Sequence, residues 1–110
     1  MISDQWDVVH VPFPFTDRAA VKKRPAAVLT NRVFNLVAGH IIMMMITKRD
    51  ESAWPNDYDL QRWEQAGLKF PSWTRLKLFT LENSLLIDKL GMIPPVDVAG
   101  FQATAKMALW

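Results

Sequence analysis

The stretch RPAAVLTNRVFNLVAGHIIMMMIT, residues 24–47, decides the fold of this chain. Residues 25–33 and 40–47 are rich in β-branched and other apolar side chains, which is typical of strands. Residues 34–39 are expected to form a turn, so that the two strands pair as an antiparallel hairpin. The second strand is apolar at every position over residues 41–46, which predicts burial on both of its faces.

The position of the turn determines which residues of this hairpin face each other. With its tip near residues 35–36, the numbers of paired residues add up to about 71, and Arg24 lies opposite Thr47. A slip of a few residues changes the partners, but it leaves the start of one strand and the end of the other at the same end of the sheet. We therefore expect Arg24 and Thr47 to be neighbours, next to a basic loop over residues 15–23.

The rest of the chain predicts short strands and one terminal helix. Further strands are expected over residues 5–11, 72–78 and, as one or two short pieces, 80–92; one or two helical turns are expected over 60–65. An amphipathic helix is expected after Pro94, with Val98, Phe101, Ala105 and Ala108 on one face. This pattern indicates a mainly β (α+β) chain, folded as a small barrel or a strongly curved antiparallel sheet that a C-terminal helix caps.

Composition narrows the class of protein. A chain of 110 residues that is half apolar suits one domain, residues 1–110, with a sizeable core. The absence of cysteine excludes disulfides, cysteine zinc sites and a thiol nucleophile, and two histidines are too few for most metal sites, so neither metal nor cofactor is expected. The N-terminus lacks the features of a secretory signal and the longest apolar run is too short for a bilayer, so we expect a cytoplasmic protein without membrane contact.

The charges are segregated along the chain, although the net charge is only +2. Residues 17–24 and 69–77 are basic, whereas residues 50–64 are acidic. Alternation along the strand over 72–78 places Trp73, Arg75 and Lys77 on one face. That face is either a surface where bases stack and phosphates meet cations, or a core tryptophan with cations at its rim.

Several motifs together resemble the PemK/MazF family of toxin endoribonucleases, over nearly the whole chain. They are WDVVHVPFPFTD, KKRPAAVL, the strand ending in MITK, AGLKFPSWTRLKLFTLE, IDKLGMI and the terminal helix. The resemblance implies an SH3-like barrel, a homodimer, metal-independent cleavage of single-stranded RNA, and inhibition by a small cognate antitoxin.

The resemblance also implies a set of site residues. Arg24 in the K-R-P motif matches the catalytic arginine, Thr47 matches the catalytic threonine, and Arg75 matches a further arginine that some members use. Two departures concern those members: Lys77 stands where they have an aspartate, and their loop histidine has no match in residues 15–23. The expected RNA-binding residues are Phe15, Lys22, Lys23, Trp73 and Lys77.

Metal-free RNA cleavage implies a defined set of tasks for these side chains. The 2′-hydroxyl of the substrate attacks the adjacent phosphorus and leaves a 2′,3′-cyclic phosphate and a 5′-hydroxyl. Arg24 suits charge stabilisation because a guanidinium grips phosphate with two donors, Thr47 can hydrogen-bond a phosphate oxygen, and Arg75 could supply a second cation. The general base stays unassigned: Lys77 needs a lowered pKa, and His10 has suitable chemistry but lies in the middle of a strand.

Two other functions stay open. A related toxin group on this fold poisons DNA gyrase through C-terminal residues that include a tryptophan, and Trp110 ends this chain. Alternatively, with Lys77 in place of the carboxylate, the protein binds RNA without cutting it. The acidic segment over residues 50–64 is expected to flank the site or to face another partner, because it repels RNA.

Overall fold

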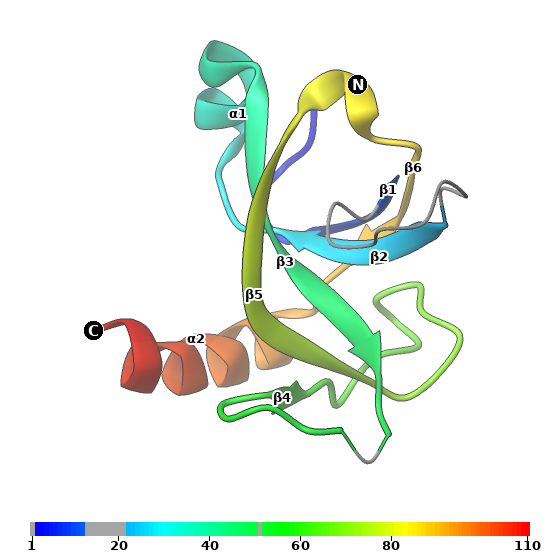
Figure 1. Cartoon of the computed structure of the whole chain (residues 1–110), viewed down its shortest axis with the longest axis vertical. Coiled ribbons are helices and arrows are strands. Elements are labelled where there is room, and N and C mark those ends of the chain that lie inside the picture. The colour runs from blue at the N-terminus through cyan, green and yellow to red at the C-terminus, as the bar shows by residue number, and fades with distance from the viewer. Residues whose placement is uncertain (1, 13–21, 51) are drawn as a thin grey trace.

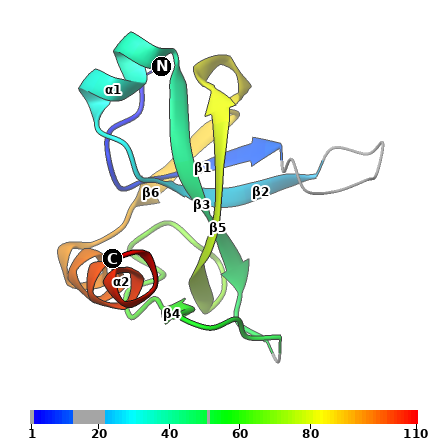
Figure 2. The same cartoon turned by 60° about the vertical axis from the view of Figure 1, so that its left-hand side comes forward.

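The computed structural model describes residues 2–12, 22–50 and 52–110. Its strands form one antiparallel sheet in the order β4-β5-β3-β2-β1-β6. The elements are β1 (Asp7–Pro12), β2 (Lys23–Val28), α1 (Arg32–Ala38), β3 (His40–Lys48), β4 (Tyr58–Asp59), β5 (Ser72–Glu82), the 3₁₀ turn η1 (Asn83–Leu85), β6 (Asp88–Met92) and α2 (Pro95–Leu109). The sheet curls into a half-barrel, with β3 and β5 crossing β1 and β2 steeply and α2 beside β4 (Figures 1 and 2). The predicted mainly β fold with a C-terminal helix is confirmed.

The central hairpin has the predicted register but a different connection. Ala26 pairs with Met45, and Val28 pairs with Met43, so each pair of numbers adds up to 71. The connection is the helix α1 rather than a turn, and the prediction of strand up to residue 33 is wrong. The Asn31 side chain accepts a hydrogen bond from the backbone N–H of Phe34, which caps the start of the helix. Gly39, with φ of 68°, ends it in the left-handed conformation.

Both faces of β3 are buried, as predicted. Met44 and Ile46 pack on one face in a cluster that includes Phe101 of α2. Ile41 and Met43 pack on the other face, inside the curl of the sheet, in a separate cluster. Because β3 contributes to two cores, its position is held from both sides, and so is the strand end that carries Thr47.

Strand β5 is not the regular strand that the sequence predicts. It is longer than residues 72–78, and its pairing with β3 shifts between Met44 and Met45. The shift inserts two residues, Leu76 and Lys77, into β5. An insertion of two residues keeps the alternation of faces, and Arg75 and Lys77 both lie near the Trp54 ring. Arg75 is buried, whereas Trp73 and Lys77 are half-buried.

Residues 61–67 form a run of turns, in which the Ala66 N–H donates to the Arg62 carbonyl at 3.1 Å, the hydrogen bond of a single helical turn. Gly67, with φ of 88°, follows this turn, where the sequence predicts one or two helical turns over 60–65. Asp97, in the first turn of α2, is fully buried and holds this segment. Its carboxylate accepts hydrogen bonds from the Tyr58 hydroxyl and from the backbone N–H groups of Gln61 and Arg62, at 2.8, 2.8 and 2.9 Å. Among the described residues, no helix has the length and apolar character of a membrane span.

Candidate active site

A groove of about 500 Å³ opens at the end of the sheet where β2 begins and β3 ends. Arg24 of β2 and Thr47 of β3 both line it, so the structure brings together the pair that the hairpin register predicts. The segment 67–70, between the turns and β5, forms another wall. We call this cavity the groove.

The groove is rich in positive charge. Of the described residues, Lys23, Arg24, Lys48 and Lys69 line it, together with one carboxylate, that of Asp50. Within residues 2–12, 22–50 and 52–110, no carboxylate makes an ion pair with the Arg24 guanidinium. Cations gathered in a concave site raise the local concentration of anionic ligands, which suits a phosphate chain.

Close backbone packing holds the 67–70 wall in place. A side-chain Cβ at Gly67 would lie 2.2 Å from the Leu90 carbonyl oxygen, and Gly67 has φ of 88°, so only glycine fits this contact with β6. The wall then carries Lys69 and the exposed ring of Phe70 along the groove. The Lys48 Nζ lies 4.4 Å from the centre of the Phe70 ring, which links the wall to the end of β3.

His10 also lines the groove. In the sheet it lies opposite Pro25 of β2 on one side and opposite Asp88 of β6 on the other. Its Nδ1 is 2.7 Å from the Asp88 Oδ1, and its side chain is 20% exposed. The sequence placed His10 in the middle of a strand but could not reveal its neighbours, because β6 is separated from it by more than seventy residues.

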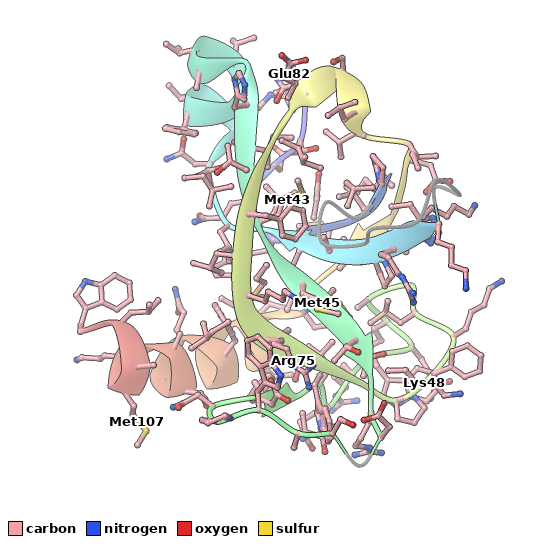
Figure 3. The ribbon with its side chains drawn as sticks, viewed as in Figure 1. Met43, Met45, Lys48, Arg75, Glu82 and Met107 are labelled. Atoms are coloured by element: carbon pink, nitrogen blue, oxygen red, sulfur yellow. The ribbon has the colours of Figure 1, made fainter. Side chains whose placement is uncertain are left out.

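Arg75 does not line the groove. Its Nε and Nη2 donate to the two carboxylate oxygens of Asp57, at 3.1 and 2.8 Å, and Nη2 also donates to the Ser52 carbonyl at 2.9 Å. The side chains of Arg75 and Asp57 are 9% and 4% exposed. The Trp54 ring lies against the guanidinium, with 4.9 Å between its centre and Cζ. Figure 3 shows Arg75 near the bend of β5, apart from Lys48 at the end of β3.

The predicted RNA-binding residues are divided among several places. Lys23 lines the groove, and Lys22 is exposed just before β2. Trp73 is half-buried and lies opposite Thr47 in the sheet. Lys77 lies near the Trp54 ring, with 5.7 Å between Nζ and the ring centre. Phe15 lies outside the described residues.

The groove also contains residues that sequence reasoning missed. Lys48 and Phe70 carried no signal of their own, whereas Lys69 and Asp50 belonged to the basic and acidic segments that the sequence does show. In the part of the chain that the structure describes, no group of three His, Asp or Glu side chains could hold a metal ion.

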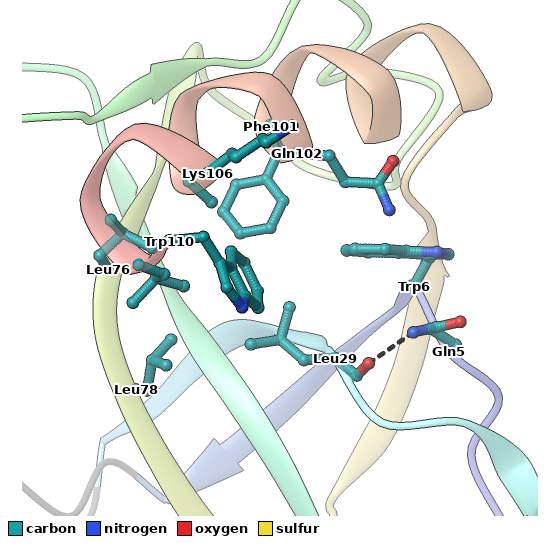
Figure 4. Close-up of a pocket in the computed structure, with 11 residues that line it drawn as sticks. Gln5, Trp6, Leu29, Leu76, Leu78, Phe101, Gln102, Lys106 and Trp110 are labelled. Carbon is teal, nitrogen blue, oxygen red and sulfur yellow. Dashed lines mark hydrogen bonds between the residues drawn. The ribbon is translucent and has the colours of Figure 1, made fainter.

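A second cavity, of about 400 Å³, lies between α2 and the sheet. Its lining is mainly apolar and includes Trp6, Leu76, Phe101 and Trp110 (Figure 4). Trp110 is 89% exposed, so the end of the chain presents an indole at the rim of this apolar pocket.

Comparisons with known proteins agree with this architecture. Three similar solved structures are a MazE–MazF complex (Form-III) from Deinococcus radiodurans, an endoribonuclease in complex with its cognate antitoxin from a mycobacterial species, and the toxin MazF-mt6 of Mycobacterium tuberculosis. The first has a TM-score of 0.77 at 21% identity and covers 99% of this chain and 97% of that chain. The second has a TM-score of 0.75 at 14% identity and covers 98% of this chain and 93% of that chain. The third has a TM-score of 0.72 at 16% identity and covers 93% of this chain and 94% of that chain.

These similarities show a common fold. A search of curated proteins found no match. A family model described as PemK-like, MazF-like toxin of type II toxin-antitoxin system matches residues 4–108. Because that match spans nearly the whole sequence, this chain belongs to the PemK-like, MazF-like family of toxins of type II toxin–antitoxin systems.

Proposed function

We propose that this toxin is an endoribonuclease that cleaves single-stranded RNA without a metal ion, and that the groove is its active site. The observation that carries the proposal is the meeting of Arg24 and Thr47 in a cavity lined by further cations. A phosphodiester is anionic, and its cleavage adds negative charge at phosphorus. Fixed cations that face this charge stabilise the transition state more than the ground state.

The roles follow from the chemistry of the two side chains. The 2′-hydroxyl attacks the adjacent phosphorus, and the bond to the 5′-oxygen breaks, which leaves a 2′,3′-cyclic phosphate and a 5′-hydroxyl. This attack passes through a phosphorane, in which phosphorus has five oxygen neighbours. The planar, permanently charged guanidinium of Arg24 donates hydrogen bonds to two of these oxygens. The Thr47 hydroxyl donates to a phosphate oxygen and keeps the reacting atoms in line.

Arg75 has a different role in this proposal from the one that the resemblance implies. Its guanidinium already donates hydrogen bonds to the Asp57 carboxylate and the Ser52 carbonyl in a nearly buried site. Moving it to a phosphate would leave the Asp57 carboxylate buried without its cation, which is costly. We therefore assign Arg75 to the support of the loop that carries Trp54, and not to the phosphorane.

The same cations suit an acidic protein partner. Two of the similar solved structures are complexes of a toxin or endoribonuclease with its antitoxin, which supports a cognate antitoxin for this chain. We propose that an acidic segment of the antitoxin lies over the groove and blocks RNA, that the toxin is a homodimer, and that it acts in the cytoplasm. Charge reversal at Lys22 and Lys23 should then weaken binding of RNA and antitoxin together.

The test is incubation of the purified protein with a mixed single-stranded RNA pool in EDTA, followed by mapping of the ends. We expect 5′-hydroxyl and cyclic-phosphate ends, and a loss of about 100- to 1000-fold in rate for Arg24→Ala or Thr47→Ala. Arg32→Ala is the matched control, because Arg32 is an exposed arginine on α1 that pairs with Asp4. Full activity of Arg24→Ala would refute its assignment.

One observation favours a second candidate. The exposed Trp110 at the rim of an apolar pocket suits a protein contact, as in poisoning of DNA gyrase. Deletion of Trp110 separates the two functions: loss of toxicity with intact RNA cleavage supports the gyrase mechanism. Tight RNA binding by the wild-type protein without turnover would instead identify an RNA-binding member that does not cut.

A further inference from the structure

The close pair of His10 Nδ1 and Asp88 Oδ1, 2.7 Å apart, lies at the groove but has no part in the roles assigned so far. We propose that His10 is the general base that takes the proton of the 2′-hydroxyl, and that Asp88 is the residue that positions it. This inference rests on the proposed function, RNA cleavage in the groove. It concerns the one proton transfer for which Arg24 and Thr47 offer no acceptor.

The other side chains of the groove are poorly suited to this task. Arginine and lysine are protonated at neutral pH and have no lone pair to offer, and a threonine hydroxyl is a very weak base. Asp50 lines the groove, but a carboxylate is ordinarily a much weaker base than an imidazole, and its Oδ1 accepts a hydrogen bond from the Ser52 backbone N–H at 2.7 Å. An imidazole titrates near neutrality, where a general base is most effective.

Asp88 prepares the imidazole for accepting a proton. The carboxylate oxygen lies 2.7 Å from Nδ1, so the Nδ1–H donates to it and the lone pair resides on Nε2. The same carboxylate stabilises the imidazolium that forms after proton transfer. Both residues are held by backbone pairing, since His10 and Asp88 are direct partners between β1 and β6.

His10 lines the same groove as Arg24 and Thr47. In the sheet it lies opposite Pro25, next to the pair that Val11 forms with Arg24. The His10 side chain is partly exposed, so a ligand in the groove has access to it.

The proposed step balances without a co-reactant other than water. Nε2 accepts the 2′-hydroxyl proton as the 2′-oxygen forms its bond to phosphorus. The bond between phosphorus and the 5′-oxygen breaks, and that oxygen takes a proton from water to become the 5′-hydroxyl. The imidazolium then returns its proton to water.

The pH dependence of cleavage reports on this step. The titratable and charged groups around His10 in the described structure lie on both neighbouring strands and across the groove: Asp88 and Lys89 on β6, Lys23 and Arg24 on β2, and Lys48, Asp50 and Lys69 in the groove. Carboxylates, lysines and arginines ordinarily keep their charge between about pH 5 and 8, whereas an imidazole does not. An acidic limb in the rate over this range therefore reports the imidazole.

The experiment is single-turnover cleavage of an RNA substrate in EDTA between about pH 5 and 8. The wild-type rate should rise tenfold per pH unit at the acidic end. His10→Ala and His10→Gln should lower the rate by about 10²- to 10⁴-fold and remove this limb, and added imidazole should restore part of the rate to His10→Ala. His40→Ala is the matched control, because His40 is an exposed histidine whose Nδ1 lies 3.0 Å from the Ala38 carbonyl. His10→Gln tests the role if His10→Ala does not fold.

Asp88→Asn tests positioning. An amide retains a polar contact to Nδ1 but no longer stabilises imidazolium, so the acidic limb should move to lower pH and the rate should fall with KM nearly unchanged. A purely structural role would leave the position of the limb unchanged.

The outcomes distinguish this inference from the proposed function. Wild-type cleavage together with an unchanged rate and limb in both His10 variants overturns the inference and leaves the nuclease intact. A 5′-sulfur leaves without taking up a proton, so a substrate with this leaving group does not need a general acid. If His10→Ala cleaves that substrate at the wild-type rate, His10 is the general acid, and the inference that it is the base is overturned. No cleavage by the wild-type protein overturns both.

Discussion

The buried pair formed by Arg75 and Asp57 gives the sharpest test of whether Arg75 has a structural or a catalytic role. Both charges are almost fully removed from water, and two hydrogen bonds join them. Removing either partner leaves the other buried without compensation, which typically costs about 3–5 kcal/mol. We therefore expect Asp57→Ala and Arg75→Ala each to lose about that much stability, a large part of the stability of a small domain.

The double variant is the informative one. With both charges gone, no buried ion is left uncompensated, so the loss should be close to that of one single variant and not to the sum of both. Urea unfolding followed by fluorescence of the five tryptophans measures all three variants. Additive losses, with a coupling energy below about 0.5 kcal/mol, would refute the pair as the function of Arg75.

An activity assay separates this role from catalysis. Arg75→Met replaces the charge by an apolar side chain of similar reach, and in combination with Asp57→Asn it avoids an uncompensated charge. If Arg75 only supports the loop, the folded double variant should cleave RNA within a few-fold of the wild-type rate. A loss of about 100-fold or more in the cleavage rate of a fully folded double variant would show that Arg75 stabilises the transition state.

Three further predictions concern α2 and the groove. Asp97→Ala should lose about 3–5 kcal/mol in urea unfolding, because it leaves three donors without their buried acceptor. Burial and the hydrogen bond to Asp97 raise the pKa of Tyr58 to about 12, above its ordinary 10.0, so the stability that Tyr58 contributes is complete below pH 10 and is lost as the pH rises through about 12. Unfolding at alkaline pH should therefore affect the wild type more than Tyr58→Phe. In an inactive Thr47→Ala background, Lys69→Ala should make the salt dependence of RNA binding shallower by about 0.7 in log–log slope, and an unchanged slope would remove Lys69 from the site.

The parts of the fold that the sequence predicted depend on local pattern. The register between β2 and β3 follows from two apolar segments of known spacing, and it holds although a helix replaces the turn. The caps of that helix, Asn31 and Gly39, are visible in the sequence. The helix α1 was not predicted because its apolar residues include exposed ones, so that the sequence shows no amphipathic pattern. Val33 and Val37 are 71% and 82% exposed.

The parts that the sequence could not predict depend on contacts between distant segments. The bulge in β5 is set by its pairing with β3, and the burial of Arg75 is set by Asp57 on another loop. In the same way, His10 gains its carboxylate only because β6 returns to pair with β1. Periodicity groups Arg75 and Lys77, which both lie near the Trp54 ring, but it cannot show that Arg75 is buried against a carboxylate from a distant loop.

The charge pattern shows how these contacts bear on function. The acidic segment over residues 50–64 was expected to repel RNA, yet two of its carboxylates are paired with arginines: Asp57 with Arg75, and Asp59 with Arg49 at 2.6 Å. Each such pair cancels a negative charge close to β3 and β5. Among the described residues, the groove is lined by Lys23, Arg24, Lys48 and Lys69 and by one carboxylate, that of Asp50. A chain of low net charge can thus present a positive groove, because part of its acidic segment is neutralised by arginines that lie outside the groove lining.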